Sequence, residues 1–175
     1  FVGSVTDRKN PKIIIESLET IDGDVSLEII GQTPNLKYLK ELNNLISSSK
    51  YSERITMTPF IEAEQLISKY ASANLFILPS KSEGLGRVVI EAQATACPVL
   101  VSSNTGMVDL IIENETGYIF ENNNKNDLSN KIQYIMNNYE SALQTGLNSK
   151  NFIKENQSVA NFEFGYKKLI DLVSI

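Results

Sequence analysis

Residues 74–102 read NLFILPSKSEGLGRVVIEAQATACPVLVS, and two kinds of pattern alternate along this stretch. A short apolar run over 74–78 stops at Pro79, a helical pattern covers about 87–96, and a second apolar run covers 98–102. Short apolar strands separated by helices are typical of a parallel sheet that is covered on both faces. The stretch therefore predicts one strand–helix–strand unit of an α/β fold.

The same alternation continues in both directions along the chain. Further strands are predicted at 1–5, 25–30, 55–58 and 118–120, and helices at about 10–21, 35–48, 62–71 and 108–113, with helices broken near Gly146 and Gln157 from residue 125 on. Without an internal repeat or a domain boundary, residues 1–175 are expected to form one domain. The predicted fold is a doubly wound, six-stranded, parallel Rossmann-like sheet with helices on both faces. In such sheets, ligands bind beyond the carboxyl ends of the strands.

Composition excludes several function classes. The 175 residues carry a net charge of -5, so no basic field attracts nucleic acid or anionic lipid. Histidine is absent, which excludes Ser-His-Asp and Cys-His catalysis and removes the commonest zinc ligand. The only cysteine, Cys97, cannot form an intrachain disulfide and is expected to pack in the core. No apolar run reaches the ~20 residues that span a bilayer. These features favour a cytoplasmic protein.

The strongest candidate motif follows the strand at 74–78. Gly84 and Gly86 let the backbone approach a ligand closely, and the helix start behind them favours phosphate. Glu83 stands at the mouth of this loop, and Glu91 follows eight residues later, a little over two helical turns at ~3.6 residues per turn. Carboxylates accept hydrogen bonds from sugar hydroxyls. A bare Gly-x-Gly is more often a simple strand–helix turn with solvated glutamates, so the motif alone establishes no site.

A resemblance to a known family suggests a function for this loop. The stretch EGLGRVVIEAQATACPVLVSSNTGMVDLIIENETGYIF, residues 83–120, resembles the C-terminal, donor-binding domain of family 4 glycosyltransferases, which are retaining enzymes of the GT-B fold. These enzymes carry two glutamates separated by seven residues, as Glu83 and Glu91 are. FVGSVTDRKNPKIIIESL at the start of the chain resembles the family's opening strand and helix. The resemblance covers essentially the whole chain.

The resemblance implies a role for each matching position. Glu83 would contact hydroxyls of the donor sugar beside the reacting carbon, Lys9 would neutralise the diphosphate, and Glu91 would hold the ribose. The remaining donor contacts implied are backbone amides at Gly84, Leu85 and Gly86, the base near Phe60 and Ile61, and a Gly-rich loop near the sugar at Asn104, Thr105 and Gly106.

The chain departs from the family pattern in ways that bear on catalysis. The family usually has an arginine directly after the glycine that matches Gly3, where this chain has Ser4. Arg8 is the nearby residue that could supply the missing charge. Ala96 occupies a position where glycine is common. Ser4 in place of arginine removes one of the positive charges that are expected to bind the diphosphate.

The implied reaction is transfer of a hexose from a nucleoside diphosphate sugar to an acceptor with retention, in bacterial polysaccharide or glycoconjugate synthesis. The acceptor-binding N-terminal domain would be missing, so the chain alone should bind donor without transferring it, and any membrane contact, at the inner face, would come through that domain. No metal or other cofactor is expected, because Asp22-Gly23-Asp24 lies at the wrong end of the sheet and fits a turn. Two alternatives stay open: a degenerate module that binds donor without turnover, and a sugar-nucleotide epimerase on the same fold.

Overall fold

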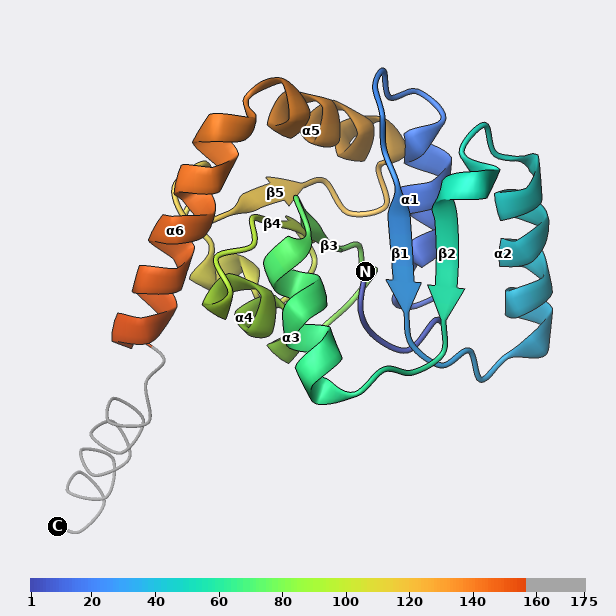
Figure 1. Ribbon diagram of the computed structural model, residues 1–175, viewed down its shortest axis with the longest axis horizontal. Helices are drawn as coiled ribbons and strands as arrows, with labels where there is room; N and C mark the ends of the chain where they lie inside the picture. The colour runs from blue at the N-terminus through green and yellow to red at the C-terminus, as the bar shows by residue number, and fades with distance from the viewer. Residues whose placement is uncertain (157–175) are drawn as a thin grey trace, which may run out of the picture.

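The computed structural model describes residues 1–156. Helices and strands alternate along the chain (Figure 1). In order they are α1 (Pro11–Leu18), β1 (Leu27–Ile30), α2 (Leu36–Ser48), the 3-10 turn η1 (Ser52–Arg54), β2 (Ile55–Thr58), α3 (Ala63–Ser72), β3 (Phe76–Leu78), α4 (Arg87–Ala94), β4 (Val99–Ser102), the 3-10 turn η2 (Val108–Leu110), β5 (Tyr118–Phe120), α5 (Lys125–Asn137) and α6 (Tyr139–Asn156). This order confirms the predicted α/β class.

All strand pairs among the described residues are parallel, as predicted, but a single six-stranded sheet is not confirmed. The described residues form five strands in two sheets, β1-β2 and β3-β4-β5. The expected first strand, residues 1–5, makes only one bridge, Val2 with Ile30. It runs beside β1, since the Gly3 amide donates to the Ile30 carbonyl at 2.9 Å. However, Gly3 has φ +143, which no regular strand adopts, so residues 1–5 do not form a regular strand.

The two faces of the β3-β4-β5 sheet bury different side chains. Ile77, Leu100 and Phe120 point into one apolar cluster, together with α1 and α5. Leu78 and Val101 point into a second cluster on the opposite face, together with α3 and α4. This alternation is the two-residue period of a strand that is covered on both sides. The sheet is therefore doubly covered, as the sequence predicts.

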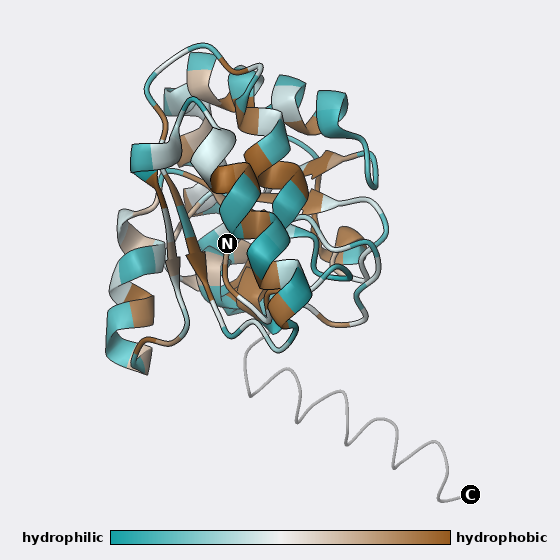
Figure 2. Cartoon of the chain, turned by 90° about the vertical axis from the view of Figure 1, so that its right-hand side faces the viewer, coloured by the Kyte–Doolittle hydropathy of each residue, from teal (hydrophilic) through white to brown (hydrophobic). Residues whose placement is uncertain are grey.

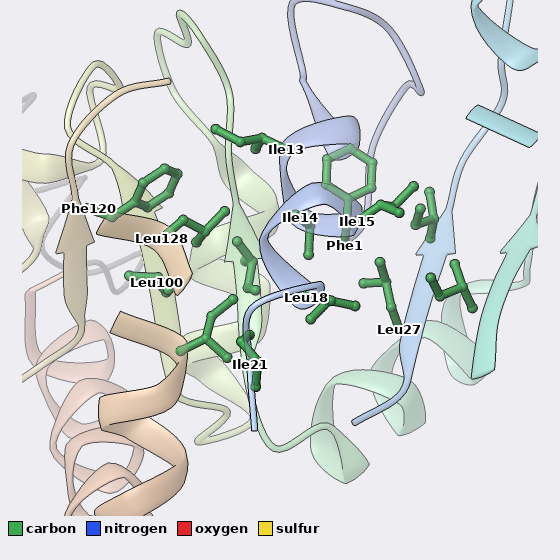
Figure 3. Close-up of a cluster of buried hydrophobic side chains, with 14 of the residues drawn as sticks. Phe1, Ile13, Ile14, Ile15, Leu18, Ile21, Leu27, Leu100, Phe120 and Leu128 are labelled. Atoms are coloured by element: carbon green, nitrogen blue, oxygen red, sulfur yellow. The ribbon is translucent and has the colours of Figure 1, made fainter. Parts of the chain in front are cut away.

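Helix α1 links the two sheets. Figure 3 shows the side chains of Ile13, Ile14 and Ile15 between the residues of the larger sheet and those of β1. Each of these isoleucines is buried, and burying such a side chain contributes about 1.5–3 kcal/mol. The helices carry both hydrophilic and hydrophobic residues (Figure 2).

Helix α6 runs unbroken through Gly146, so the predicted break there is wrong. Gly146 is buried, and a Cβ at this position would lie 2.2 Å from the carbonyl oxygen of Ala96. The glycine lets α6 approach the turn after α4 closely; it does not interrupt the helix. The second predicted break, near Gln157, lies outside the described residues.

Two further features agree with the sequence. Cys97 is buried in the core, and burial raises the pKa of its thiol to about 12, so the thiol stays protonated and unreactive. Among residues 1–156, no helix combines the length and the apolar character that crossing a bilayer requires.

Candidate functional site

A pocket of about 460 Å³ lies beyond the carboxyl ends of β3 and β4. It is lined by Arg8, Ser82, Glu83, Gly84, Ser103, Asn104, Thr105 and Gly106. These residues come from three loops, which follow the segment 1–5, strand β3 and strand β4. Because the strands are parallel, their carboxyl ends meet at one edge, and loops far apart in the chain converge there.

A cluster of two cations and one carboxylate lies at this pocket, and two of its members, Arg8 and Glu83, line the pocket. The Glu83 carboxylate pairs through Oε2 with Lys9 Nζ and with Arg8 Nη1, the latter at 3.2 Å. Arg8 Nη1 also donates to the Ser82 carbonyl at 2.8 Å. The Lys9 and Glu83 side chains are only 13% and 12% exposed. Little water therefore reaches this pair to screen it.

The cations control the ionisation of Glu83. Partial burial by itself would raise the pKa of this carboxyl, but the hydrogen bond and charge of Lys9, and then Arg8, outweigh it and hold the pKa below its usual range. Glu83 is therefore ionised at neutral pH, and the cluster carries one net positive charge, which suits an anionic ligand.

The main chain of Lys81 ties the three loops together. Its amide donates to the Arg8 carbonyl at 2.8 Å, and its carbonyl accepts from Asn104 Nδ2 at 2.6 Å and from Asn122 Nδ2 at 3.4 Å. The Gly106 amide adds a bond to the Glu83 carbonyl at 2.8 Å. These bonds hold Glu83 against the loop at 103–106.

A side chain at each of the three glycines of the site would have a different consequence. A Cβ on Gly106 would lie 2.2 Å from the Gly84 carbonyl oxygen, so Gly106 allows two loops to meet. A Cβ on Gly86 would lie 2.9 Å from Leu78 Cδ2, so Gly86 seats helix α4 on the sheet. A Cβ on Gly84 would meet nothing within 4 Å. Only Gly84 therefore leaves open space that a ligand could use.

The predicted site residues fall into two groups. Arg8, Glu83, Gly84 and the loop 104–106 line the pocket, and Lys9 lies against Glu83 without lining it. Five others do not line it: Phe60, Ile61, Leu85, Gly86 and Glu91.

These five come from two segments, the loop between β2 and α3, and helix α4 with the two residues before it. Phe60 and Leu85 are 65% and 62% exposed, and Phe60 lies in the loop between β2 and α3. Glu91 lies on α4, where its Oε2 accepts a hydrogen bond from Tyr70 Oη at 3.1 Å. Their role in donor binding therefore stays a prediction.

Sequence reasoning missed four residues of this neighbourhood. Ser82 and Ser103 line the pocket, and the rule that ligands bind at strand ends would have found them, since each lies in a loop after a strand. Asn122 follows strand β5, so the same rule covers it, whereas Tyr70 carries no such signal. Tyr70 reads as a core residue of α3, and only the packing of α3 on α4 brings its hydroxyl to Glu91.

Acidic residues are dispersed in this structure. No group of three or more His, Cys, Asp or Glu side chains within residues 1–156 is placed to hold a metal ion. Asp24 pairs with Arg54, and the Asp22 amide donates to Gln133 Oε1 at 2.8 Å. Both aspartates precede β1, at the edge opposite the pocket.

A family comparison decides the class of the protein. The model of the glycosyl transferases group 1 family matches residues 1–152. The chain belongs to this glycosyltransferase family. The membership confirms the resemblance found in the sequence, and it explains why the loop with Glu83 and Gly84 lies at the carboxyl edge of a parallel sheet.

Relatives of this glycosyltransferase chain are about twice its length or longer. An uncharacterized glycosyltransferase of Methanocaldococcus jannaschii is 31% identical over 157 residues, covering 89% of this chain and 42% of the relative. The capsular polysaccharide biosynthesis glycosyltransferase CapM of Staphylococcus aureus is 31% identical over 144 residues, covering 78% of this chain and 36% of the relative. The chain thus spans less than half the length of either.

A solved structure supports the same fold. The crystal structure of HepE from Anabaena, in complex with UDP and glucose, matches with a TM-score of 0.88 at 18% identity, over 98% of this chain and 48% of that one. The Rossmann-like arrangement of parallel strands and helices is therefore that of about half of the HepE structure.

Proposed function

We propose that this chain is the donor-binding half of an enzyme that transfers a hexose from a nucleoside diphosphate sugar to an acceptor with retention at the anomeric carbon. The observation that carries this proposal is the pocket in which Arg8, Lys9 and Glu83 meet beside the open Gly84. Cations there suit a diphosphate, and a carboxylate suits sugar hydroxyls.

The chemistry follows from the charge that develops on the leaving diphosphate. Lys9 and Arg8 would stabilise it, assisted by the amino end of helix α4, whose N-cap Gly86 provides no capping side chain. A helix end of this kind contributes about 0.3–1 kcal/mol toward an anion when exposed. Glu83 would orient the sugar beside the bond that breaks. No metal is needed in this scheme, because the two side chains supply the positive charge.

The outer residues complete the donor site in this proposal. Glu91 would accept hydrogen bonds from the ribose, and Phe60 and Ile61 would border the base. The exposed Phe60 offers an aromatic face at the loop that follows β2. The acceptor would be held by the N-terminal domain of the full-length protein, in the cleft that faces this edge of the sheet. The relationship to CapM supports a role in polysaccharide or glycoconjugate synthesis.

Calorimetry and a transfer assay together test the proposal. The 175-residue chain should bind UDP or GDP and their sugars, yet transfer no sugar. Catalysis also needs an oriented acceptor, which can be worth about 7–11 kcal/mol of the barrier. Robust turnover by the chain alone would contradict the half-enzyme model. In the full-length enzyme, a chelator should leave activity unchanged, and a loss restored by magnesium or manganese would disprove metal independence.

One observation favours a second candidate, a donor-binding module without turnover. Ser4 stands where the family usually has an arginine, and it is exposed, so one cation of the usual clamp is absent at that position. Arg8 lines the pocket instead and reaches Glu83. A full-length protein that binds a nucleotide sugar, but transfers nothing to any acceptor offered, would support this candidate.

A further inference from the structure

The Glu83 carboxylate lies between the pocket and Lys9 and pairs with both cations of the charged cluster. Glu83 lines the pocket, whereas Lys9 does not. Oxygen Oε2 of Glu83 holds both Lys9 Nζ and Arg8 Nη1. An anion that enters the pocket to reach these cations must therefore compete with a carboxylate that already pairs with them.

Two related ligands would respond differently to this carboxylate. A nucleoside diphosphate ends in a free phosphate whose second ionisation lies at about pH 6, so it carries about one more negative charge at neutral pH than the sugar donor. In the donor, that phosphate is esterified, and the sugar offers hydroxyl donors that a carboxylate accepts. The donor can thus gain hydrogen bonds from Glu83, while the free diphosphate meets mainly repulsion.

We propose that Glu83 is a specificity-determining residue that favours the nucleotide sugar over the free nucleoside diphosphate at this site. This inference rests on the proposed function. In the catalytic cycle, the same repulsion would assist release of the diphosphate product, because Glu83 regains Lys9 and Arg8 as the product leaves. Glu83 would then raise selectivity for the nucleotide sugar over the nucleoside diphosphate, while lowering the affinity of the site for phosphate groups.

Burial makes the effect measurable. The side chains of Lys9 and Glu83 are 13% and 12% exposed, so solvent screens their charges weakly. Removing the Glu83 charge would leave Lys9 without its partner, and a diphosphate could then neutralise it. Glu83, although it belongs to the proposed donor site, should therefore oppose binding of the nucleoside diphosphate product.

Isothermal titration calorimetry of Glu83→Gln and Glu83→Ala tests this inference. The probes are UDP and UDP-glucose, with GDP and GDP-mannose in parallel. Since like charges a few ångströms apart repel appreciably even at a protein surface, we expect either variant to bind the diphosphate about fivefold tighter or better. Affinity for the nucleotide sugar should rise less or fall, because hydroxyl acceptors are lost. The ratio of the two affinities should therefore drop.

A matched control separates this local effect from a change in net charge. Glu41→Gln removes the same charge from an exposed pair with Lys12, away from the pocket, and should leave both affinities unchanged. Raising the salt from about 0.02 to about 0.5 M should shrink the gain in Glu83→Gln, since screening weakens the repulsion. Thermal unfolding shows that each variant is folded at the titration temperature.

The outcomes distinguish this inference from the proposed function. If the unsubstituted chain binds the nucleotides, but both Glu83 variants bind the diphosphate equally or more weakly, the inference is wrong and the donor site stands. If the unsubstituted chain binds none of the four nucleotides, the proposed function fails and the inference fails with it.

Discussion

The hydroxyl of Tyr70 donates a hydrogen bond to Glu91 Oε2 at 3.1 Å, and this bond links the core to the outer part of the site. The Tyr70 ring is buried and packs edge-on against Phe76, with ring centroids 5.4 Å apart. Burial, and then the Glu91 carboxylate, raise the pKa of Tyr70 above its usual range. The hydroxyl therefore stays protonated as a donor, on a ring that is packed in the core.

Tyr70→Phe should weaken nucleotide binding by orienting Glu91 less well. The variant keeps the ring and removes only the hydroxyl, so we expect affinity to fall about two- to twelvefold, at about 0.5–1.5 kcal/mol for one hydrogen bond. Calorimetry with UDP and UDP-glucose measures this. Tyr134→Phe, on the exposed side of α5, is the control.

A double-mutant cycle shows whether Tyr70 acts through Glu91. Glu91→Gln should itself weaken nucleotide binding. Adding Tyr70→Phe to Glu91→Gln should then cost much less than it does alone. Equal losses in both backgrounds would mean that Tyr70 acts independently of the carboxylate.

Ala96→Gly should stabilise the fold. Ala96 has φ +64, in the left-handed region where a side chain costs about 1–2 kcal/mol, which explains why glycine is common there. Part of this gain is offset, because glycine gives the unfolded chain more conformational freedom, which lowers stability by about 0.4–1 kcal/mol. We expect a net gain of about 0.5–1 kcal/mol in urea unfolding. The control is Ala94→Gly, in α4, which should instead lower stability by about the same amount; a loss at both positions would argue against strain at Ala96.

Gly146→Ala should destabilise the fold, although alanine has a higher helix propensity than glycine. In an exposed helix, alanine is favoured over glycine by about 1 kcal/mol. At this position, however, the new Cβ would lie 2.2 Å from the Ala96 carbonyl, and relieving such overpacking costs about 1–3 kcal/mol. Urea unfolding should show a net loss, while Gln144→Ala on the exposed side of α6 should not. A gain at Gly146 would mean that α6 does not pack closely on this turn.

Ionisation of Glu83 should contribute to stability in a defined range of pH. Its folded pKa lies below the ordinary value, so the contribution is complete above the unfolded pKa of about 4.3. It is lost as the pH falls through the lower, folded pKa. The difference in unfolding free energy between the unsubstituted chain and Glu83→Gln should thus be constant from about pH 5 to 7 and shrink below about pH 4. A difference that grows on acidification would contradict the assigned ion pairs.

Local patterns were reliable where a segment is apolar and short. Strands β2 and β5 begin and end where the sequence predicts, because alternation and flanking turn residues are properties of the local chain. The loop with Glu83 and Gly84 was also found, since it follows the most apolar strand and precedes a helix. The strand expected at 1–5 was not confirmed, because pairing depends on neighbours that local pattern does not specify.

Sequence alone determined the parallel α/β class, the order of elements and the position of the glutamate-bearing loop, because these depend on periodicity and on spacing along the chain. Tertiary structure alone decided the partners: Lys9 and Arg8 on Glu83, the Tyr70 hydroxyl on Glu91, and Gly146 against Ala96. All of these contacts join residues that lie 21 to 75 positions apart in the sequence. Their geometry follows from how the helices pack on the sheet, and no periodicity in the sequence encodes a distance between two side chains.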